Sequence, residues 1–252
     1  MSISRDCERI MMLKIPGLQS AAKRYVAIPF EPISITAALK QAIIFYDPLY
    51  LDNLLARCVL ESAQGDAILE NTPEPYWFPL PLKMLWHADN GCPLWAASVF
   101  LPEGKVITDM VYLHKRTDRF EFSEKQPKAN VGRWMSRRIP YQVRQAETKR
   151  WTAYCIGNAE GIERLLSNVR FLGKRRNIGF GEVDHFDIQP WDGKPIDTMV
   201  QDGKLIHAVP AACNLVTASP SPILVGWTPP QWKPSLFSMG WPVGTKINCT
   251  AV

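Results

Sequence analysis

The residues best suited to bind a ligand lie in the segment LGKRRNIGFGEV, where three consecutive cations stand between glycines. Its members are Gly173, Lys174, Arg175, Arg176, Gly179 and Gly181. Glycine allows positive φ and lets backbone N–H groups approach a phosphate closely, and basic side chains neutralise phosphate charge. The segment lacks the GxxxxGK[ST] and GxGxxG patterns of mononucleotide and dinucleotide sites. We predict a loop that binds a sugar-phosphate backbone; a tight turn with incidental cations is the alternative.

A second basic stretch precedes this loop, and aromatic residues are interleaved with its cations. Its members are Arg133, Trp134, Arg137, Arg138, Tyr141, Arg144, Lys149 and Arg150. Between Lys115 and Arg176, 16 Lys or Arg stand against 6 Asp or Glu, a net charge of +10 in a chain of net charge +5. Concentrated basic charge with aromatic residues is typical of nucleic-acid binding. A solvated charged face is the alternative.

Cysteine and histidine spacing argues against a metal site. The six cysteines are spread along the chain without a CxxC pair, and the four histidines form no HExxH. Cys58 and Cys155 lie in apolar surroundings that suit reduced thiols packed in a core. We therefore predict no metal and no cofactor.

Strands and helices must position these residues. Residues 26–36 alternate apolar side chains and predict a strand near a sheet edge, because Pro32 cannot donate to a ladder. Apolar residues at helical spacing predict a helix over 50–63, framed by Asp47 as a cap and Asp52 as a partner of a nearby loop. Further short strands are predicted over 93–101, 105–116 and 119–124.

The basic stretch and the glycine loop belong to a predicted strand–helix–strand unit. We interpret 125–147 as a projecting, partly flexible hairpin or loop that returns into a strand at 150–156, because its apolar content is too thin to build a core layer by itself. Asn158 is predicted to cap a helix, which has the buried residues Ile162, Leu165, Leu166 and Val169. The glycine loop then leads into a strand at 182–188. The Pro- and Trp-rich region after residue 190 shows no period of its own.

Composition bounds the class of protein. The 252 residues are 46% hydrophobic and 21% charged, which is typical of a folded domain. The sequence has no run of about 18 apolar residues, so we expect no membrane-spanning helix. Charged residues occupy the N-terminus where a signal peptide has its apolar stretch. We therefore predict a cytoplasmic protein.

The segment FLGKRRNIGFGEV is similar to the glycine-rich loop of the RAMP superfamily of CRISPR-associated proteins, whose domains are ferredoxin-like and RRM-related. The block FEPISIT…YDPLYLDNLLARCVL resembles the first strand and helix of this family, especially in the small subunits of type IV systems. The chain is most like the Cas-five-type subunit at the 5′ end of the CRISPR RNA (crRNA). The resemblance spans roughly residues 26–190.

The resemblance implies an α+β protein of three parts. These are an N-terminal tail (1–25), a ferredoxin-like RAMP core (26–190) with a basic thumb insertion at about 125–150, and a C-terminal extension (191–252) without a family counterpart. Subunits of this kind grip the crRNA 5′ handle, and their thumb kinks the guide and contacts the neighbouring backbone subunit. The implied partners are the crRNA, Cas-seven-type backbone subunits, a large Cas-eight-type subunit and the target DNA of an antiviral effector complex.

Roles for single residues follow from the same resemblance. Gly173, Gly179 and Gly181 would shape the loop, and Lys174, Arg175 and Arg176 would bind phosphates. Trp134 or Tyr141 would stack on a splayed base. The thumb and its return strand would be lined by the cations Arg133, Arg137, Arg138, Arg144, Lys149 and Arg150.

Two other functions remain open from the sequence. Some RAMP proteins are metal-independent endoribonucleases, which need a base for the 2′-OH and an acid for the leaving oxygen. His114, Tyr141, Lys149 and His185 have suitable side chains but form no recognisable pair. In these enzymes the glycine loop lies near the C-terminus, whereas about 70 residues follow it here. We therefore expect a non-catalytic subunit. A generic RRM-like RNA-binding protein is the second alternative.

Overall fold

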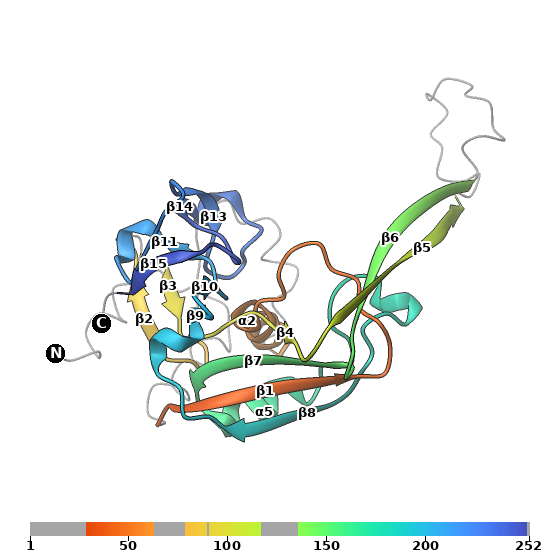
Figure 1. Ribbon diagram of the computed structural model, residues 1–252. Helices are drawn as coiled ribbons and strands as arrows, with labels where there is room; N and C mark the ends of the chain where they lie inside the picture. The colour runs from red at the N-terminus through yellow and green to blue at the C-terminus, as the bar shows by residue number, and fades with distance from the viewer. Residues whose placement is uncertain (1–28, 63–78, 90, 117–135, 251–252) are drawn as a thin grey trace, which may run out of the picture.

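The computed structural model describes residues 29–62, 79–89, 91–116 and 136–250, and its architecture confirms the predicted α+β class (Figure 1). The α-helices of this part are α2 (Leu51–Ser62) and α5 (Ala159–Leu166). The strands of the N-terminal two thirds are β1 (Glu31–Leu39), β2 (Met84–His87), β3 (Pro93–Trp95), β4 (Leu101–Pro102), β5 (Val106–Arg116), β6 (Ser136–Ala146), β7 (Arg150–Gly157) and β8 (Val183–Pro190).

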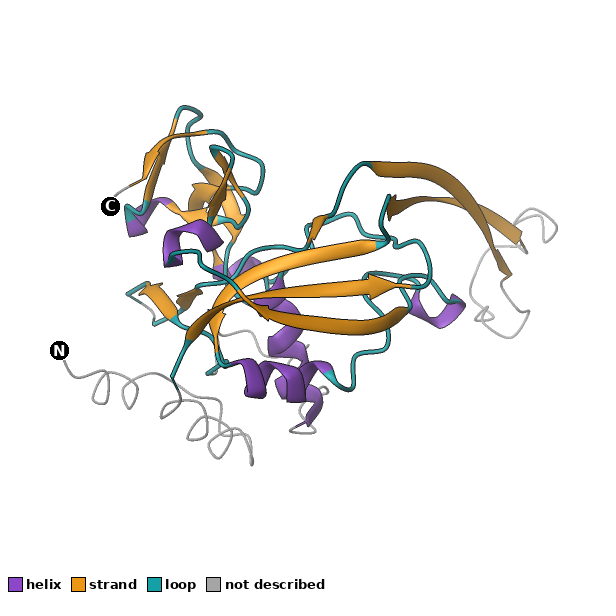
Figure 2. Cartoon of the chain, turned by 60° about the horizontal axis from the view of Figure 1, so that its bottom comes forward, coloured by secondary structure: helices purple, strands orange, loops and turns teal. Residues whose placement is uncertain are grey.

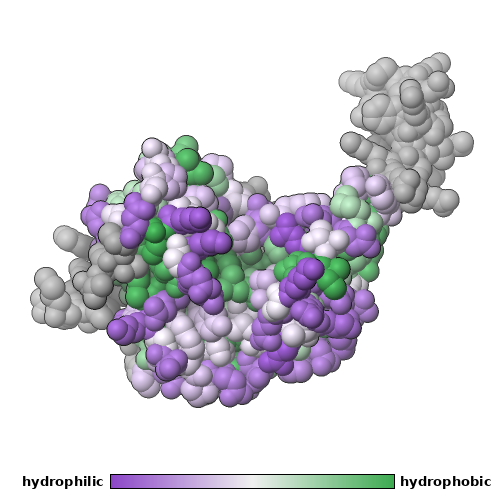
Figure 3. Space-filling view, in the orientation of Figure 1, coloured by the Kyte–Doolittle hydropathy of each residue, from purple (hydrophilic) through white to green (hydrophobic). Residues whose placement is uncertain are grey.

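The main sheet is antiparallel, with the strand order β4-β7-β1-β8. Along the chain its elements follow as β1, α2, β4, β7, α5 and β8, so β1 separates the two strands that flank α5. Alternate residues of β1, such as Ile33 and Ile35, are buried in the same cluster as the apolar residues of α2 and α5. The opposite face is polar: Thr36 and Thr152 lie across from one another there, their Oγ1 atoms 2.8 Å apart. Figure 3 shows this face at its lower centre, mostly in white and purple.

The prediction that the first strand lies near a sheet edge is wrong. β1 begins at Glu31 and is central, because it pairs with β7 on one side and with β8 on the other. Pro32 is tolerated because it is the second residue of the strand and pairing with β8 begins only at Ile33. The proline therefore marks the start of a strand.

The predicted strand over 105–116 is confirmed as β5, which pairs with β6 from Val106↔Ala146 to Arg116↔Ser136. Figure 1 shows this hairpin projecting from the body of the molecule. The predicted projection of 125–147 is thus confirmed for β6. The predicted strand at 119–124 lies outside the described residues.

The part of β6 nearest the body of the molecule (residues 139–146), called the hairpin foot below, contributes a few residues to the core. Tyr141 and Val143 are buried with Ile44 in a small apolar cluster, and Ala146 joins the main core. This agrees with the expectation that the stretch cannot build a core layer by itself, because its buried residues pack against residues from other parts of the chain. A few apolar side chains suffice here because Ile44 comes from a distant part of the chain.

The predicted helix over 50–63 is confirmed as α2, and the helix after Asn158 is confirmed as α5. α5 ends at Leu166, so Val169, which was predicted on its buried face, lies beyond the helix and is half-buried. α2 buries Leu51, Leu55 and Val59 on one face. Asn158 caps α5 as predicted: its Oδ1 accepts a hydrogen bond from the Gly161 N–H at 2.7 Å, satisfying a donor of the first helical turn. The strand predicted at 93–101 is instead split into β3 and β4, which pair with different strands: β3 with β2 and β4 with β7.

The C-terminal region forms short strands and single-turn helices around the other end of α2 (Figure 2). The strands are β9 (Val200–Gln201), β10 (Lys204–Leu205), β11 (Val209–Pro210), β12 (Val216–Ala218), β13 (Ile223–Gly226), β14 (Phe237–Trp241) and β15 (Ile247–Thr250). Its 3-10 helices are η4 (Pro195–Thr198), η5 (Ala211–Cys213) and η6 (Pro234–Leu236), whereas η3 (Arg176–Ile178) lies in the glycine loop. Trp227, Leu236 and Trp241 are buried in the same cluster as β1 and α2.

A buried carboxylate ties this region to α2. Asp52 has no solvent exposure, and its oxygens accept hydrogen bonds from the Gln231 Nε2 at 3.0 Å and from the Asn53 backbone N–H at 2.8 Å. His207, equally buried, lies with Nε2 3.3 Å from the second oxygen. The interpretation of Asp52 as a partner of a nearby loop is therefore confirmed.

The remaining features bear on membrane and metal chemistry. Neither α2 nor α5, the helices of the described segments, is both long and apolar enough to cross a bilayer. Within those segments, no three His, Cys, Asp or Glu side chains gather as a metal site requires. Cys58 and Cys155 are buried, as predicted for core thiols. Burial raises the pKa of the Cys58 thiol to about 12.

Candidate nucleic-acid interface

The glycine loop adopts a backbone that its glycines make possible. Gly173 and Gly181 have φ of +77° and +70°, in the left-handed region that L side chains avoid. A Cβ at Gly173 would lie 2.5 Å from the Ile44 carbonyl oxygen, and one at Gly181 would overlap the Leu172 carbonyl. Gly179 also has positive φ, but its Cβ would meet open space. The outer glycines therefore allow close backbone packing, while Gly179 serves the turn alone.

The loop is fastened to the connection between β1 and α2. Its Lys174 N–H donates to the Ile44 carbonyl at 2.7 Å, and the Gly181 N–H donates to the Ala42 carbonyl at 2.9 Å. On its other side the same connection bonds to β6, because Ile43 and Arg144 exchange both backbone hydrogen bonds at 2.8 Å. Residues 42–47 thus lie between the glycine loop and the hairpin and hold both in place.

Two of the loop cations rest on aromatic rings from these neighbours. The Lys174 Nζ lies 4.6 Å from the centre of the Tyr46 ring, and the Arg175 Cζ lies 4.5 Å from the centre of the Tyr141 ring. Both distances are within the range of cation–π attraction. The rings hold the cations at the surface without neutralising them. Lys174 also lies 3.7 Å from Asp47, a long and exposed ion pair that contributes little stability.

Arg144 belongs to β6 but lies on the face of that strand opposite Tyr141, because side chains alternate along a strand. Its guanidinium lies 4.5 Å from the centre of the Phe45 ring and donates to the Gln142 Oε1 at 3.1 Å. No carboxylate within 4.0 Å of Arg144 is recorded among the described residues. Arg144 does not line the pockets around the glycine loop, so the structure does not bring it together with Lys174 and Arg175.

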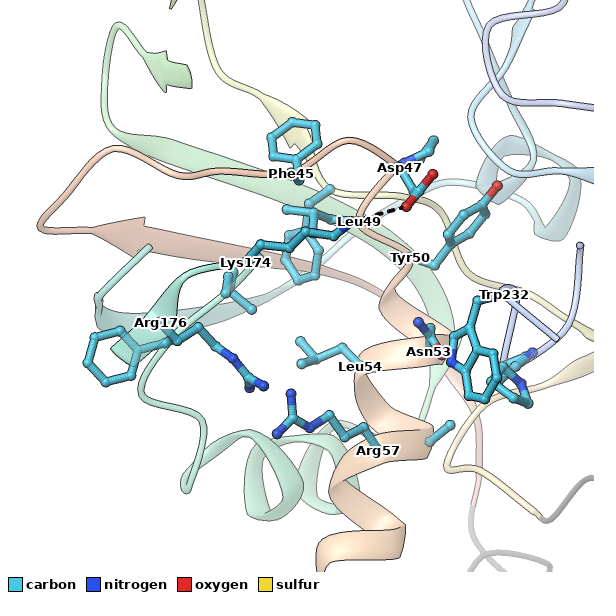
Figure 4. Close-up of a pocket in the computed structure, with 18 of the residues that line it drawn as sticks. Phe45, Asp47, Leu49, Tyr50, Asn53, Leu54, Arg57, Lys174, Arg176 and Trp232 are labelled. Carbon is cyan, nitrogen blue, oxygen red and sulfur yellow. Dashed lines mark ion pairs between the residues drawn. The ribbon is translucent and has the colours of Figure 1, made fainter. Parts of the chain in front are cut away.

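Three pockets surround the loop, and Arg176 lines all of them. The first, of about 610 Å³, lies between α2, the loop and the turn at Pro229–Trp232 (Figure 4). The second, of about 770 Å³, lies between the loop and the hairpin foot at Ile139 and Tyr141. The third, of about 380 Å³, lies beside α2 and residues 168–171. Together they form a groove that runs from the C-terminal region past the loop to the hairpin.

Arg57 and Arg176 face one another across the first pocket (Figure 4). Partial burial and then the charge of Arg57 lower the pKa of Arg176, while Glu61 opposes them. Arg57 is paired with Glu61 at 2.6 Å, whereas no ion pair is recorded for Arg176 in the described part of the chain. The excess positive charge at this end of the pocket favours an anion.

The other predicted cations are placed differently. Lys149 has φ of 58° and forms the turn between β6 and β7. Arg150 begins β7 and is paired with Glu103 at 3.2 Å and with Asp187 at 3.6 Å, on the polar face of the sheet. Neither lines the three pockets. The structure does not bring them to the groove.

The remaining predicted residues precede β6 in the sequence or lie within it. Arg133 and Trp134 lie outside the described residues. Arg137 and Arg138 are in β6, where their backbones pair with Lys115 and His114 of β5. Tyr141 has 6% of its surface exposed and carries Arg175 on its ring, so a base could stack there only if Arg175 moved.

Among the side chains that the structure describes, no recorded hydrogen bond or ion pair joins two of the residues suited to RNA cleavage. His185 is exposed on β8, where its Nδ1 lies 2.9 Å from the Asp184 carboxylate, and it lines none of the three pockets. Tyr141 is covered by Arg175, and Lys149 lies in a turn. His114 pairs with Arg138 within the hairpin.

The groove also contains residues that the sequence analysis did not assign to it. Asp47, interpreted as a helix cap, instead pairs with Lys174, because α2 begins four residues later at Leu51. Asn53, Arg57 and Trp232 line the first pocket. A possible signal was the polar face of the predicted helix, which carries Asn53 and Arg57, but nothing in the sequence places the glycine loop opposite that face.

Comparison with known proteins finds a family match over the segment that contains the glycine loop. Residues 125–194 match the family described as CRISPR type IV associated protein Csf3. The matched segment is 70 of the 252 residues and includes β6, β7, α5, the glycine loop and β8. The resemblance to type IV CRISPR-associated proteins is thereby confirmed over this segment.

Among solved structures, the chain is similar to one in "Cryo-EM structure of the Type III-B Cmr-beta bound to cognate target RNA". The two share 10% identity with a TM-score of 0.31, over 68% of this chain and 65% of that chain. The chain thus spans less than two thirds of that protein, and a similarity at this level carries no argument about function. No curated protein matches the chain.

Proposed function

We propose that this chain, which contains a type IV CRISPR-associated segment, is a non-catalytic RNA-binding subunit of a CRISPR effector ribonucleoprotein. It would hold the 5′ handle of the crRNA in the groove around the glycine loop and contact the neighbouring backbone subunit through the hairpin. The observation that carries the proposal is the position of Lys174, Arg175 and Arg176. They project from a backbone-fixed loop onto a groove that continues to the hairpin foot.

The architecture supports a ferredoxin-like RAMP core. The chain order β1-α2-β4-β7-α5-β8 is a βαββαβ arrangement with β1 and β7 in the centre of the sheet. The hairpin of β5 and β6 is inserted between β4 and β7, ahead of the second half of this arrangement. That is the place where a thumb is expected. The glycine loop leads into the last strand, also as expected.

The groove is suited to a sugar-phosphate backbone. Contacts to phosphate need fixed cations, and these side chains are positioned by aromatic rings and backbone bonds. The aromatic rings here mainly support cations, so most contacts would be electrostatic and would weaken steeply with salt.

The hairpin offers a surface for a neighbouring subunit. On β5, Met110 and Tyr112 share one face and are 46% and 47% exposed. Exposed apolar and aromatic side chains on a projecting element are typical of contact surfaces. We assign this face to the Cas-seven-type backbone subunit. A Cas-eight-type subunit, target DNA and a cytoplasmic location follow from membership of such a complex.

We favour a non-catalytic role over an endoribonuclease because no recorded contact joins two of the candidate groups whose side chains the structure describes. General acid–base cleavage needs two titratable groups on opposite sides of one phosphate. His185 and Tyr141 are on different elements and contact other protein groups. A cleavage assay on precursor crRNA, with product formation absent at every pH tested, is the expected result.

The decisive experiment is purification of the tagged protein from a host that expresses its neighbouring genes, followed by sequencing of the nuclease-protected RNA. We expect one class of short RNAs with a common repeat-derived 5′ end, together with other subunits. Mixed RNA bound to the protein alone would favour the generic RNA-binding alternative. Release of a cleaved product would favour the endoribonuclease.

A further inference from the structure

An exposed tryptophan stands at the rim of the first pocket. Trp232 is 59% exposed, which is unusual for this residue type, and it lines the pocket with Asn53 and Arg57. Within the described residues, no hydrogen bond or ring contact to its indole is recorded. The ring is therefore available to a ligand in this pocket.

The turn that carries Trp232 is fixed on both sides. The preceding residue, Gln231, donates through Nε2 to the buried Asp52 at 3.0 Å. After it, the Lys233 N–H donates to the Pro230 carbonyl at 3.0 Å. The Gln231 carbonyl packs so tightly on Gly226 that a Cβ there would overlap it. A tryptophan held exposed by a rigid turn needs little ordering when it binds a flat ligand.

The pocket has charged side chains at two ends: two arginines at one, and a carboxylate paired with a lysine at the other. Arg57 and Arg176 face one another at one end, and no ion pair of Arg176 is recorded within the described residues. Asp47 lies at another end with Lys174. An anionic group is favoured between the arginines. Asn53, near Trp232 in Figure 4, offers an amide donor and acceptor with no partner recorded in the described part of the chain.

We infer that this pocket binds one unpaired nucleotide of RNA, with its base stacked on Trp232 and a phosphate between Arg57 and Arg176. Asn53 contacts the edge of the base. The pocket volume of about 610 Å³ is in the range of small-molecule sites. The inference rests on the proposed function and adds to it: the C-terminal region contributes a base-binding wall to a groove that otherwise contacts phosphates.

The test measures binding of fluorescein-labelled octamers of rA to the purified chain by anisotropy across a salt series. Trp232→Ala is expected to weaken binding by about 5- to 100-fold, since stacking on an aromatic side chain contributes that much per base. The dependence on salt should not change, because no charge is removed. Arg176→Gln should instead reduce the slope of log affinity against log salt by roughly 0.7.

An octamer with abasic riboses separates stacking from structural effects. On it, Trp232→Ala and the unchanged chain are expected to bind equally. Leu224→Ala is the matched control, because Leu224 is 65% exposed on β13 and lies outside the pockets. Trp232→Phe, which keeps a ring, should retain most of the affinity.

The outcomes distinguish the two proposals. If the unchanged chain binds rA and Trp232→Ala binds equally well, the stacking site is refuted and the proposed function is not. If the loss in Trp232→Ala persists on the abasic octamer, the tryptophan acts through the protein structure, and the stacking site is again refuted. If the unchanged chain binds neither octamer, both proposals fail.

Discussion

The Arg175 guanidinium lies 4.5 Å from the centre of the Tyr141 ring, and this contact joins the glycine loop to the foot of the hairpin. Arg175 has φ of 60°, so its backbone turns the side chain toward β6 at a conformational cost. The contact thereby places the glycine loop against β6, which carries part of the second basic stretch of the sequence.

We predict that Tyr141→Ala lowers both stability and RNA affinity. Removing a buried aromatic side chain costs about 3 kcal/mol, and Arg175 loses the ring that positions it. Urea denaturation and RNA anisotropy measure the two effects. Tyr141→Phe keeps the ring and should retain both. A Phe variant that binds as weakly as the Ala variant would show that the hydroxyl, not the ring, is the group that matters.

The glycine loop provides a matched pair of substitutions. Gly181→Ala places a Cβ against the Leu172 carbonyl in a left-handed conformation, whereas Gly179→Ala has the conformational cost alone. That cost is about 1–2 kcal/mol. We expect Gly181→Ala to lower the free energy of unfolding by more than this conformational cost. Gly179→Ala should lower it by no more than that cost. Equal losses would mean that the close packing at Gly181 relaxes easily.

Charge reversal tests the loop as a phosphate site. The triple variant Lys174→Glu, Arg175→Glu, Arg176→Glu should abolish guide retention at moderate salt and leave the fold intact, because these side chains lie at the surface. The control reverses the exposed Lys105, Lys194 and Lys204, which lie outside the three pockets, and so makes the same change in net charge. Guide retention by the loop variant equal to that of the control would disprove the assignment.

The end of the hairpin can be tested separately from its foot. Replacing residues 117–135 by a short Gly–Ser turn removes Arg133 and Trp134 and keeps the buried Tyr141 and Val143. We expect weaker assembly with the neighbouring subunit, seen by size-exclusion chromatography, with the melting temperature unchanged. A large fall in the melting temperature would instead show that the replaced segment contributes to the core.

Stability should decline in alkaline solution because of buried thiols. Burial raises the pKa of Cys92 to about 11 and that of Cys58 to about 12, from an ordinary value of 9.0. In the unfolded chain these thiols lose their protons above pH 9, whereas in the folded chain they keep them. The free energy of unfolding should therefore be constant below pH 9 and fall between pH 9 and 11, by up to about 1.4 kcal/mol per unit for each thiol. Cys92→Ala should flatten this decline, as followed by urea denaturation at each pH. A stability that is unchanged up to pH 11 would contradict the burial of these groups.

Local signals predicted the elements well. Helical spacing located α2, and Asn158 marked the start of α5 to the residue. The glycine loop was predicted from residue types, because positive φ at Gly173 and Gly181 is a property of glycine itself. These features depend on interactions within a few residues of the chain.

Long-range pairing was the part that the sequence did not reveal. Pro32 indicated an edge strand, but β1 is central because two strands from later in the chain pair with it. Arg150 was grouped with the RNA-binding cations by its charge, yet the sheet register places it beside Asp187. Trp232 was recognised as part of a Trp-rich region, but its position above the α2 helix depends on the buried bond between Gln231 and Asp52.

That bond also sets the order in which the groove can be completed. Asp52 and Gln231 are 179 positions apart, so synthesis of the chain delivers the carboxylate, the hairpin and the glycine loop long before the turn that carries Trp232. A growing chain would present its phosphate-binding cations first and its base-binding wall last. A product stopped before Gln231 would keep the former and lack the latter. Only a chain whose translation has passed Trp232 can therefore bind a base in this way.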